Sequence, residues 1–244
     1  MMRKTAEILA AFEKLPETDI TSLLQGRRPL ILAPHPDDES LGCGGLIAAA
    51  CAAGIAPVVI VLTDGAASHP GSTTWPPPKL AELRELEACR ATQCLGLPKA
   101  HLHFFRQPDT ALAAEGEMFE RLAARAGELG QQHDCSLVIG PWAADPHCDH
   151  EAAARLAAFV AGRNGWNLLS YPVWGWLREP DSLVNEPLQG GWKLNISAHL
   201  HRKNQAIAAH VSQYGELITD SPDAFRLPNT LLEVFSRPFE IFLA

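Results

Sequence analysis

Positive charge is scarce in this sequence. The chain has 20 Lys and Arg residues against 28 Asp and Glu residues, which gives a net charge of −8. Nucleic-acid-binding proteins normally carry a basic face, so this balance argues against that class and against electrostatic attachment to a membrane. A secretory leader is not visible, because Glu7 and Glu13 interrupt any apolar run after the basic start. The chain also lacks repeats, low-complexity tracts and linker composition, so we expect one cytoplasmic domain over residues 1–244.

Charged side chains are absent from residues 40–63, a stretch long enough to span a membrane. Gly54 and Pro57 interrupt it, however. We therefore interpret this stretch as a helix, a turn and a buried strand, and we predict no membrane span. The six cysteines lie mostly inside apolar segments, which indicates reduced core residues rather than a disulfide framework.

Apolar runs typical of buried strands alternate with segments of helical periodicity along the chain. We predict strands over residues 29–33, 57–63, 100–105, 135–142 and 167–174, with strand-like pieces in 230–243. We predict helices over residues 3–15, 40–54, 79–96, 115–131, 149–162 and 197–211, and a long loop over 64–78. This alternation favours an α/β fold with a largely parallel sheet.

Polar residues that carry chemistry follow three of the predicted strands. "HPDDE" (35–39) follows the first strand, Asp64 follows the second, and "DPHCDH" (145–150) follows the strand at 135–142. In open parallel sheets, ligands bind beyond the carboxyl ends of the strands. We therefore expect these three clusters to lie near one another.

Two of these clusters together match the ligand set of a catalytic metal. His35, Asp38 and His150 would supply two imidazoles and one carboxylate, which with one open position is the general form of a catalytic zinc site. Asp37 would remain free to act on a metal-bound water, and His147 could face the same centre. The simpler alternative is an acidic turn with two histidines at a helix start.

Three other functions fit parts of the pattern. A dinucleotide-binding oxidoreductase would use Gly42 and Gly44, with Asp64 on the ribose, but Ile47 replaces the third glycine and the carboxylates of 37–39 would repel a pyrophosphate. A non-haem iron oxygenase would use a two-histidine, one-carboxylate triad, which usually sits on β-rich barrels. A non-catalytic sugar- or metal-binding module of the same fold would not need a base.

Over roughly residues 29–215 the chain resembles the zinc-dependent N-deacetylases of the LmbE-like or PIG-L family. The resemblance rests on "PHPDDE" (34–39), "LTDG" (62–65), "LRELEA" (83–88), "LG" (95–96) and "HCDH" (147–150), in the family's order. It implies a Rossmann-like fold with helices on both faces of the sheet. It also implies a hydrolase that removes an acetyl or other acyl group from the amide nitrogen of an amino-sugar substrate, with one zinc ion per chain.

The resemblance also assigns roles to individual residues. The implied zinc ligands are His35, Asp38 and His150, the implied base is Asp37, the group that polarises the carbonyl or its oxyanion is His147, and the residues that hold substrate are Arg84 and Asp109. We expect Asp149 to orient an imidazole. The sequence leaves open whether His147 or Asp37 protonates the leaving amine, and which sugar is the substrate.

Two positions depart from the family pattern. Cys148 stands where the family commonly has Pro, and Asp145 stands where some members have Tyr. We expect the Cys148 side chain to point away from the metal. We interpret the histidines of the 197–211 helix, including His210, as a solvated or packed face.

Overall fold

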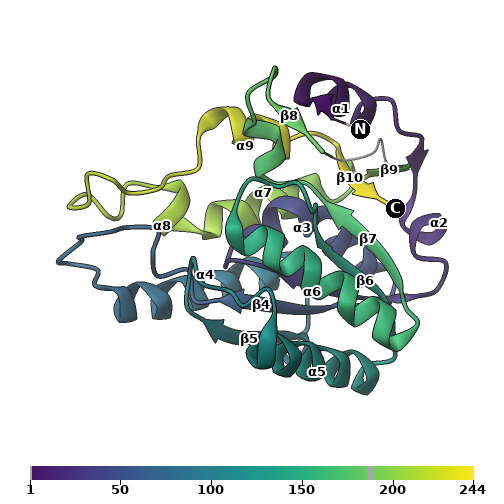
Figure 1. The fold of residues 1–244 in the computed structure, drawn as a ribbon, viewed down its shortest axis with the longest axis horizontal. Helices are drawn as coiled ribbons and strands as arrows, with labels where there is room; N and C mark the ends of the chain where they lie inside the picture. Colours follow the sequence, from purple (N-terminus) through teal and green to yellow (C-terminus); the bar gives the residue numbers. More distant parts are fainter. Residues whose placement is uncertain (1, 186–189) are drawn as a thin grey trace.

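The computed structural model describes residues 2–185 and 190–244, and within them an eight-stranded sheet forms the centre of the molecule (Figure 1). The strand order is β2 (Glu17–Thr18), β9 (Gly191–Asn195), β10 (Phe239–Leu243), β7 (Asn167–Tyr171), β6 (Cys135–Pro141), β3 (Arg28–Ala33), β4 (Val58–Thr63) and β5 (Leu102–Gln107). Only β10 runs antiparallel to its neighbours in the described sheet. The predicted α/β fold with a largely parallel sheet is confirmed.

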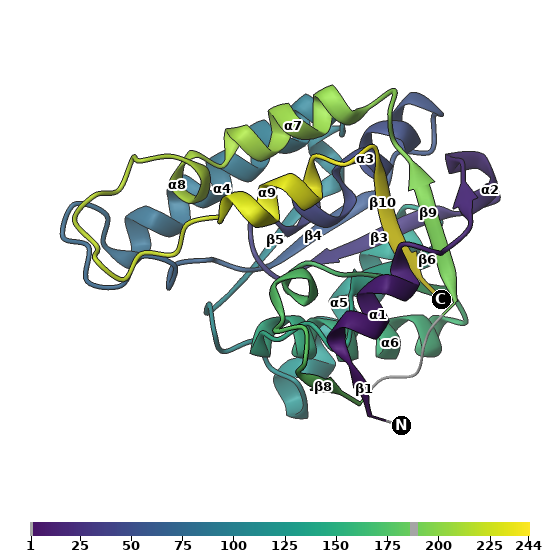
Figure 2. The same ribbon diagram turned by 90° about the horizontal axis from the view of Figure 1, so that it is seen from above.

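Helices cover both faces of this sheet, as Figure 2 shows. One face carries α3 (Asp38–Ala52), α4 (Pro77–Leu95) and α7 (Leu200–Ala209), and the other carries α5 (Gly116–Gln132) and α6 (Cys148–Asn164). The shorter elements are β1 (Arg3–Lys4), α1 (Thr5–Phe12), α2 (Ile20–Leu24), β8 (Leu183–Val184), α8 (Val211–Tyr214) and α9 (Asn229–Phe235), with 3₁₀ turns at Lys99–His101 and Trp174–Leu177.

The central strands are apolar on both sides because helices bury both sides. Along β3, Ile31 packs with the α3, α4 and α7 layer, whereas Leu30 and Leu32 pack with the α5 and α6 layer. All three side chains are fully buried. An uninterrupted apolar run such as "PLILA" is therefore required by a strand that has no solvent-facing side.

The order of the strands sets the position of the functional site. From β3 the chain moves outward through β4 to β5, then returns to place β6 on the opposite side of β3. The loops that leave β3 and β6 therefore diverge to opposite faces of the sheet. A crevice at such a switch point is the usual ligand site of an open α/β sheet.

Two of the predicted elements need correction. The prediction of strand-like pieces in 230–243 is confirmed for β10 at the end of the stretch, but the stretch begins in helix α9, which buries Leu231 and Phe235 at i and i+4. The strand predicted over 167–174 ends at Tyr171, since Pro172 follows it. Residues 40–63 form a helix, a turn and a buried strand as predicted. No described helix combines the length and apolar character needed to cross a bilayer.

Candidate active site

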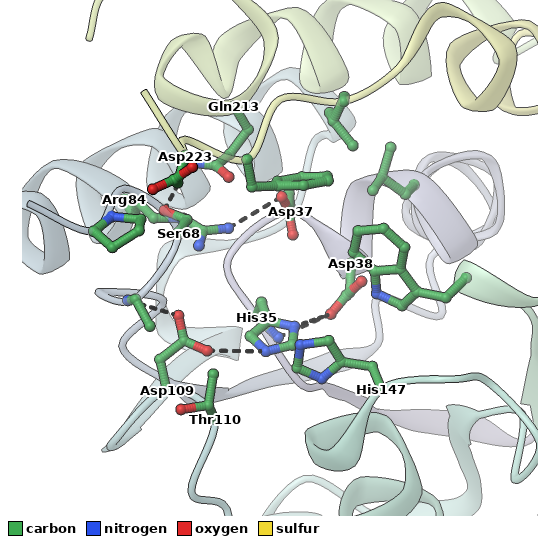
Figure 3. Close-up of a pocket in the computed structure, with 16 residues that line it drawn as sticks. His35, Asp37, Asp38, Ser68, Arg84, Asp109, Thr110, His147, Gln213 and Asp223 are labelled. Carbon is green, nitrogen blue, oxygen red and sulfur yellow. Dashed lines mark hydrogen bonds and ion pairs between the residues drawn. The ribbon is translucent and has the colours of Figure 1, made fainter. Parts of the chain in front are cut away.

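A cavity of about 260 Å³ opens at the carboxyl ends of β3, β4 and β6 (Figure 3). The loop after β3 contributes His35, Asp37 and Asp38 to its wall, and the start of α6 contributes His147. Residues far apart in the sequence therefore meet at this switch point. The parallel pairing of β3 with β6 brings their carboxyl ends to the same edge of the sheet.

One carboxylate oxygen of Asp38 lies between two imidazoles. Its Oδ2 is 3.2 Å from His35 Nδ1 and 3.2 Å from His150 Nε2. All three side chains are at least nine-tenths buried. Burial alone would raise the pKa of Asp38, but the two neighbouring imidazoles hold it well below its usual value.

The far side of each imidazole faces another acid. The Nε2 of His35 lies 3.1 Å from Asp149 Oδ2 and 3.3 Å from Asp109 Oδ1. The Nδ1 of His150 lies 3.0 Å from Asp145 Oδ2. A carboxylate behind a histidine fixes the ring and favours a proton on the far nitrogen, which leaves the near nitrogen to a metal. In this structure the near nitrogen of His150, Nε2, accepts the Trp174 Nε1–H at 3.1 Å, a hydrogen bond that a metal would replace.

This donor set fits a divalent metal ion. Two imidazole nitrogens and one carboxylate oxygen converge, which is a typical three-ligand set for catalytic zinc. The nitrogens of His35, His147 and His150 also lie within 4.8 Å of one another. Without metal, Asp38 and Asp145 outweigh burial and raise the pKa of His150 to about 9, so metal binding must displace a proton.

Asp37 lies beside this donor set and lines the cavity, and its carboxylate is held by Arg84 and not by the two imidazoles. Its Oδ2 accepts a hydrogen bond from Arg84 at 3.0 Å, and its backbone N–H donates to Glu39 Oε2 at 3.0 Å. Its φ of 149° is outside the ordinary regions for a residue with a side chain. Burial raises the pKa of Asp37 to about 6, despite the opposing charge of Arg84.

His147 caps the N-terminus of α6, and this determines its tautomer. Its Nδ1 accepts the backbone N–H of Asp149 at 3.2 Å, so the neutral ring carries its proton on Nε2. Burial, together with the charges of His35 and His150, lowers its pKa below the ordinary value. The ring stacks on Trp174, with the centroids 6.1 Å apart. At neutral pH, His147 is therefore a hydrogen-bond donor at the cavity wall.

The two residues predicted to hold substrate both line the cavity, and both also have protein partners. Arg84 donates to the carbonyls of Gly65 and Pro36 as well as to Asp37, and it is 3% exposed. Asp109 accepts the backbone N–H of Ala67 at 2.9 Å. Burial would raise the pKa of Asp109, but His35 lowers it to about 2. Direct contact of either residue with substrate stays a prediction.

The two departures from the family pattern behave differently. Cys148 is exposed, and its Sγ faces the carbonyl of Thr110 at 3.7 Å. Asp145 is fully buried behind His150. Sequence reasoning did not identify Asp145 as an orienting residue, although its position five residues before His150, within the "DPHCDH" cluster, was a usable signal.

Sequence reasoning also overlooked a segment near the C-terminus. His210 is buried, and its Nε2 lies 3.3 Å from Glu39 Oε1 and 3.2 Å from Ser40 Oγ. Gln213 and Phe225 line the cavity. Of the two expected alternatives, a solvated or a packed face, His210 has the packed one, where it makes buried polar contacts behind the loop that holds Asp37.

Comparison with known proteins places this site in a family. The PIG-L family model, described as GlcNAc-PI de-N-acetylase, matches residues 30–161. A Bacillus anthracis protein named "Probable N-acetyl-alpha-D-glucosaminyl L-malate deacetylase 2" is 26% identical over 201 residues, which cover 80% of this chain and 84% of that protein. The 1D-myo-inositol 2-acetamido-2-deoxy-alpha-D-glucopyranoside deacetylase of Kineococcus radiotolerans is 31% identical over 160 residues, 64% of this chain and 42% of that protein.

A solved structure also resembles the chain. The conserved protein TT1542 from Thermus thermophilus is 30% identical, with a TM-score of 0.59, over 77% of this chain and 80% of that one. The matched region of the family model contains every strand-end residue described above, from His35 to His150.

Proposed function

The chain belongs to the PIG-L family of de-N-acetylases, and on that premise we propose that it is a zinc-dependent enzyme that hydrolyses the acetamide of an amino sugar. The two curated relatives act, by their names, on N-acetylglucosamine-type sugars joined to different groups, malate in one and inositol in the other. Both substrates share an acetylated 2-amino-2-deoxyglucose. We assign this shared unit to the reaction centre.

We propose that His35, Asp38 and His150 hold the metal. The support is the convergence of their three donor atoms and the acid behind each imidazole. When bound, zinc would lower the pKa of a coordinated water from 15.7 to roughly 7 and would polarise the amide carbonyl. The dinucleotide-binding alternative is not favoured, because buried carboxylates occupy the turn where a pyrophosphate would bind.

Asp37 is the proposed base. It takes a proton from the attacking water as the oxygen of that water bonds to the acyl carbon. Its raised pKa, about 6, allows it to hold that proton transiently near neutral pH. Arg84 fixes the direction of its carboxylate by a 3.0 Å hydrogen bond.

His147 is proposed to stabilise the oxyanion. Its Nε2–H is free because Nδ1 is occupied by the Asp149 N–H. A donor aimed at developing negative charge favours the transition state over the substrate. A neutral imidazole with this tautomer is a poor acid, so we assign the protonation of the leaving nitrogen to Asp37. The C–N bond then breaks, and acetate and a free amine leave.

The observation that most supports this function is the single Asp38 oxygen equidistant from two histidines that are each held by another acid. The test is to strip the protein of metal, add back zinc, and measure amine release from N-acetylglucosaminides together with metal content. We expect no activity without metal and recovery with zinc. His150→Ala should lose the metal, and full metal occupancy in that variant would remove His150 from the ligand set.

Two broader predictions about the chain remain proposals. We propose that residues 1–244 form one deacetylase domain, supported by the sheet that joins β2 near the start to β10 at the end. We also propose a cytoplasmic location, supported by the burial of Cys43 and Cys135 as core residues.

A further inference from the structure

The cavity has an excess of negative charge among its described lining residues. Four carboxylates line it, from Asp37, Asp38, Asp109 and Asp223, against the single guanidinium of Arg84. The two imidazoles that line the cavity, those of His35 and His147, lie at the proposed metal centre. Adding one divalent metal ion still leaves a net negative total. Any substrate group that enters beside the reacting sugar therefore experiences a negative field.

Arg84, the one Lys or Arg among the described lining residues, is not free to bind a substrate anion. Arg84 donates through its two terminal nitrogens to Gly65 O at 2.9 Å, to Pro36 O at 2.8 Å and to Asp37 Oδ2 at 3.0 Å. Its side chain is 3% exposed, and its Nε is buried as well. Turning it toward a ligand would break three hydrogen bonds and leave Asp37 buried without its partner.

Asp223 differs from the other three acids because it belongs to no part of the catalytic set. It is exposed at the cavity, and no described residue donates a hydrogen bond to its carboxylate. Its segment is fixed against the opposite loop, since the Phe225 N–H donates to Ser68 O at 2.8 Å. Asp220, in the same segment, accepts from Ser72 Oγ at 2.7 Å and from Thr74 N at 2.9 Å. The backbone that carries Asp223 is thus held at a defined place on the cavity rim.

The residues that line the cavity near Asp223 include several apolar side chains. Trp174 and Phe225 pack edge to face with centroids 5.1 Å apart, and Leu41 and Leu227 also line the cavity. Aromatic and aliphatic surfaces bind the faces of neutral rings, and they do not replace the hydration of an anion.

From these contacts we propose that the group attached to the acetylated amino sugar is uncharged or cationic, and that Asp223 disfavours anionic groups such as carboxylate or phosphate. This inference rests on the proposed deacetylase function and narrows it to one substrate class. An inositol-type or sugar-type attached group fits this charge pattern, whereas a malate-type group does not.

The experiment compares two substrates that share the same acetylated glucosamine. One is N-acetylglucosaminyl inositol, which is neutral, and the other is N-acetylglucosaminyl malate, which is anionic. The zinc-loaded enzyme should show a kcat/KM at least about tenfold higher for the neutral compound at low salt, and added salt should narrow the ratio. Asp223→Asn should narrow the ratio by roughly fivefold, and Asp223→Lys should narrow it further.

Glu128→Lys is the matched control. Glu128 is an exposed acid on α5, away from the cavity-lining residues, and its replacement changes the net charge as Asp223→Lys does. It should leave the substrate ratio unchanged. A wild-type preference for the malate compound, or the same ratio in Asp223→Lys as in Glu128→Lys, would overturn the proposal.

The same experiment separates a failure of the charge proposal from a failure of the proposed deacetylase function. If the zinc-loaded protein releases amine from neither compound, the deacetylase assignment is wrong. The charge proposal is then judged by the Kd of the same two compounds, where tighter binding of malate would refute it and tighter binding of inositol would support it.

Discussion

Asp145 is the residue whose replacement should reveal most about the site, because it connects three backbone N–H groups to His150, a proposed metal ligand. Its Oδ2 accepts from Val173 N at 2.9 Å, from Trp174 N at 3.1 Å and from His150 Nδ1 at 3.0 Å. Its Oδ1 accepts from Gly175 N at 2.7 Å. One fully buried carboxylate thus satisfies three backbone N–H groups and orients one imidazole.

The size of the effect follows from these four contacts. A hydrogen bond to a charged group contributes about 1.5–3 kcal/mol, and an orphaned buried donor costs about 1–3 kcal/mol. Asp145→Ala should therefore cost at least about 5 kcal/mol, which approaches the whole stability of a typical domain. Asp145→Asn is the more useful change, because it keeps the side-chain volume and one acceptor oxygen and replaces only the other oxygen with an NH₂ group that cannot accept. We expect the loss in free energy of unfolding to be about half that of Asp145→Ala.

The effect on the metal should be visible separately from the effect on stability. Loss of the acid behind a metal-binding histidine typically weakens metal binding about 10–100-fold. The assay is competition for zinc against a chelator on folded Asp145→Asn, with circular dichroism to confirm the fold. Asp181→Asn is the control, since the Asp181 carboxylate is exposed and pairs with Lys4 at 2.8 Å, far from the cavity-lining residues. If the zinc Kd of Asp145→Asn is within about threefold of the wild-type value, and not about 10–100-fold weaker, the orienting role of Asp145 is refuted.

Two further predictions concern the base and its support. Asp37→Asn should keep its zinc, and its turnover should fall by roughly 10²–10⁴. In the wild type, kcat/KM should fall below about pH 6 as Asp37 is protonated, and this pH dependence should be absent from Asp37→Asn. Asp38→Asn should lose zinc instead, and the reverse pattern in the two variants would show that their roles are exchanged. His210→Leu removes the contact with Glu39 at 3.3 Å and should lower kcat, while KM and zinc content stay normal. His210→Gln should recover part of the kcat. Equal losses of kcat in both variants, or loss of zinc in either, would contradict this prediction.

The meeting of the proposed ligand residues could be predicted because each lies in the loop or helix start that follows a strand of the parallel sheet. A strand buried on both faces is recognisable as an unbroken apolar run, as in β3 and β4, and the first polar residues after it must lie at the edge of the sheet. The chemistry of His35 and Asp38 then suggests a metal without any knowledge of their geometry. The alternation of strands and helices was sufficient to place the "HCDH" motif at the same edge.

The supporting residues could not be predicted in this way, because their roles depend on contacts across the sequence. His210 lies 171 positions from Glu39, and Asp223 lies far from the loop that it faces. A histidine on a helix gives no sign of which element will bury it. The helix α9 was missed for a related reason, since "TLLEVF" is too short and too apolar for its periodicity to separate helix from strand.

Asp145 lies between these two cases, and it explains what the departure from the family pattern means in this chain. At this position a tyrosine would offer one hydroxyl, which can accept only weakly and would have to reach across to His150. The carboxylate instead accepts from three successive backbone N–H groups at Val173, Trp174 and Gly175 and still reaches His150. Asp145 therefore holds the backbone of Trp174, whose ring stacks on His147, and it favours the His150 tautomer with its proton on Nδ1.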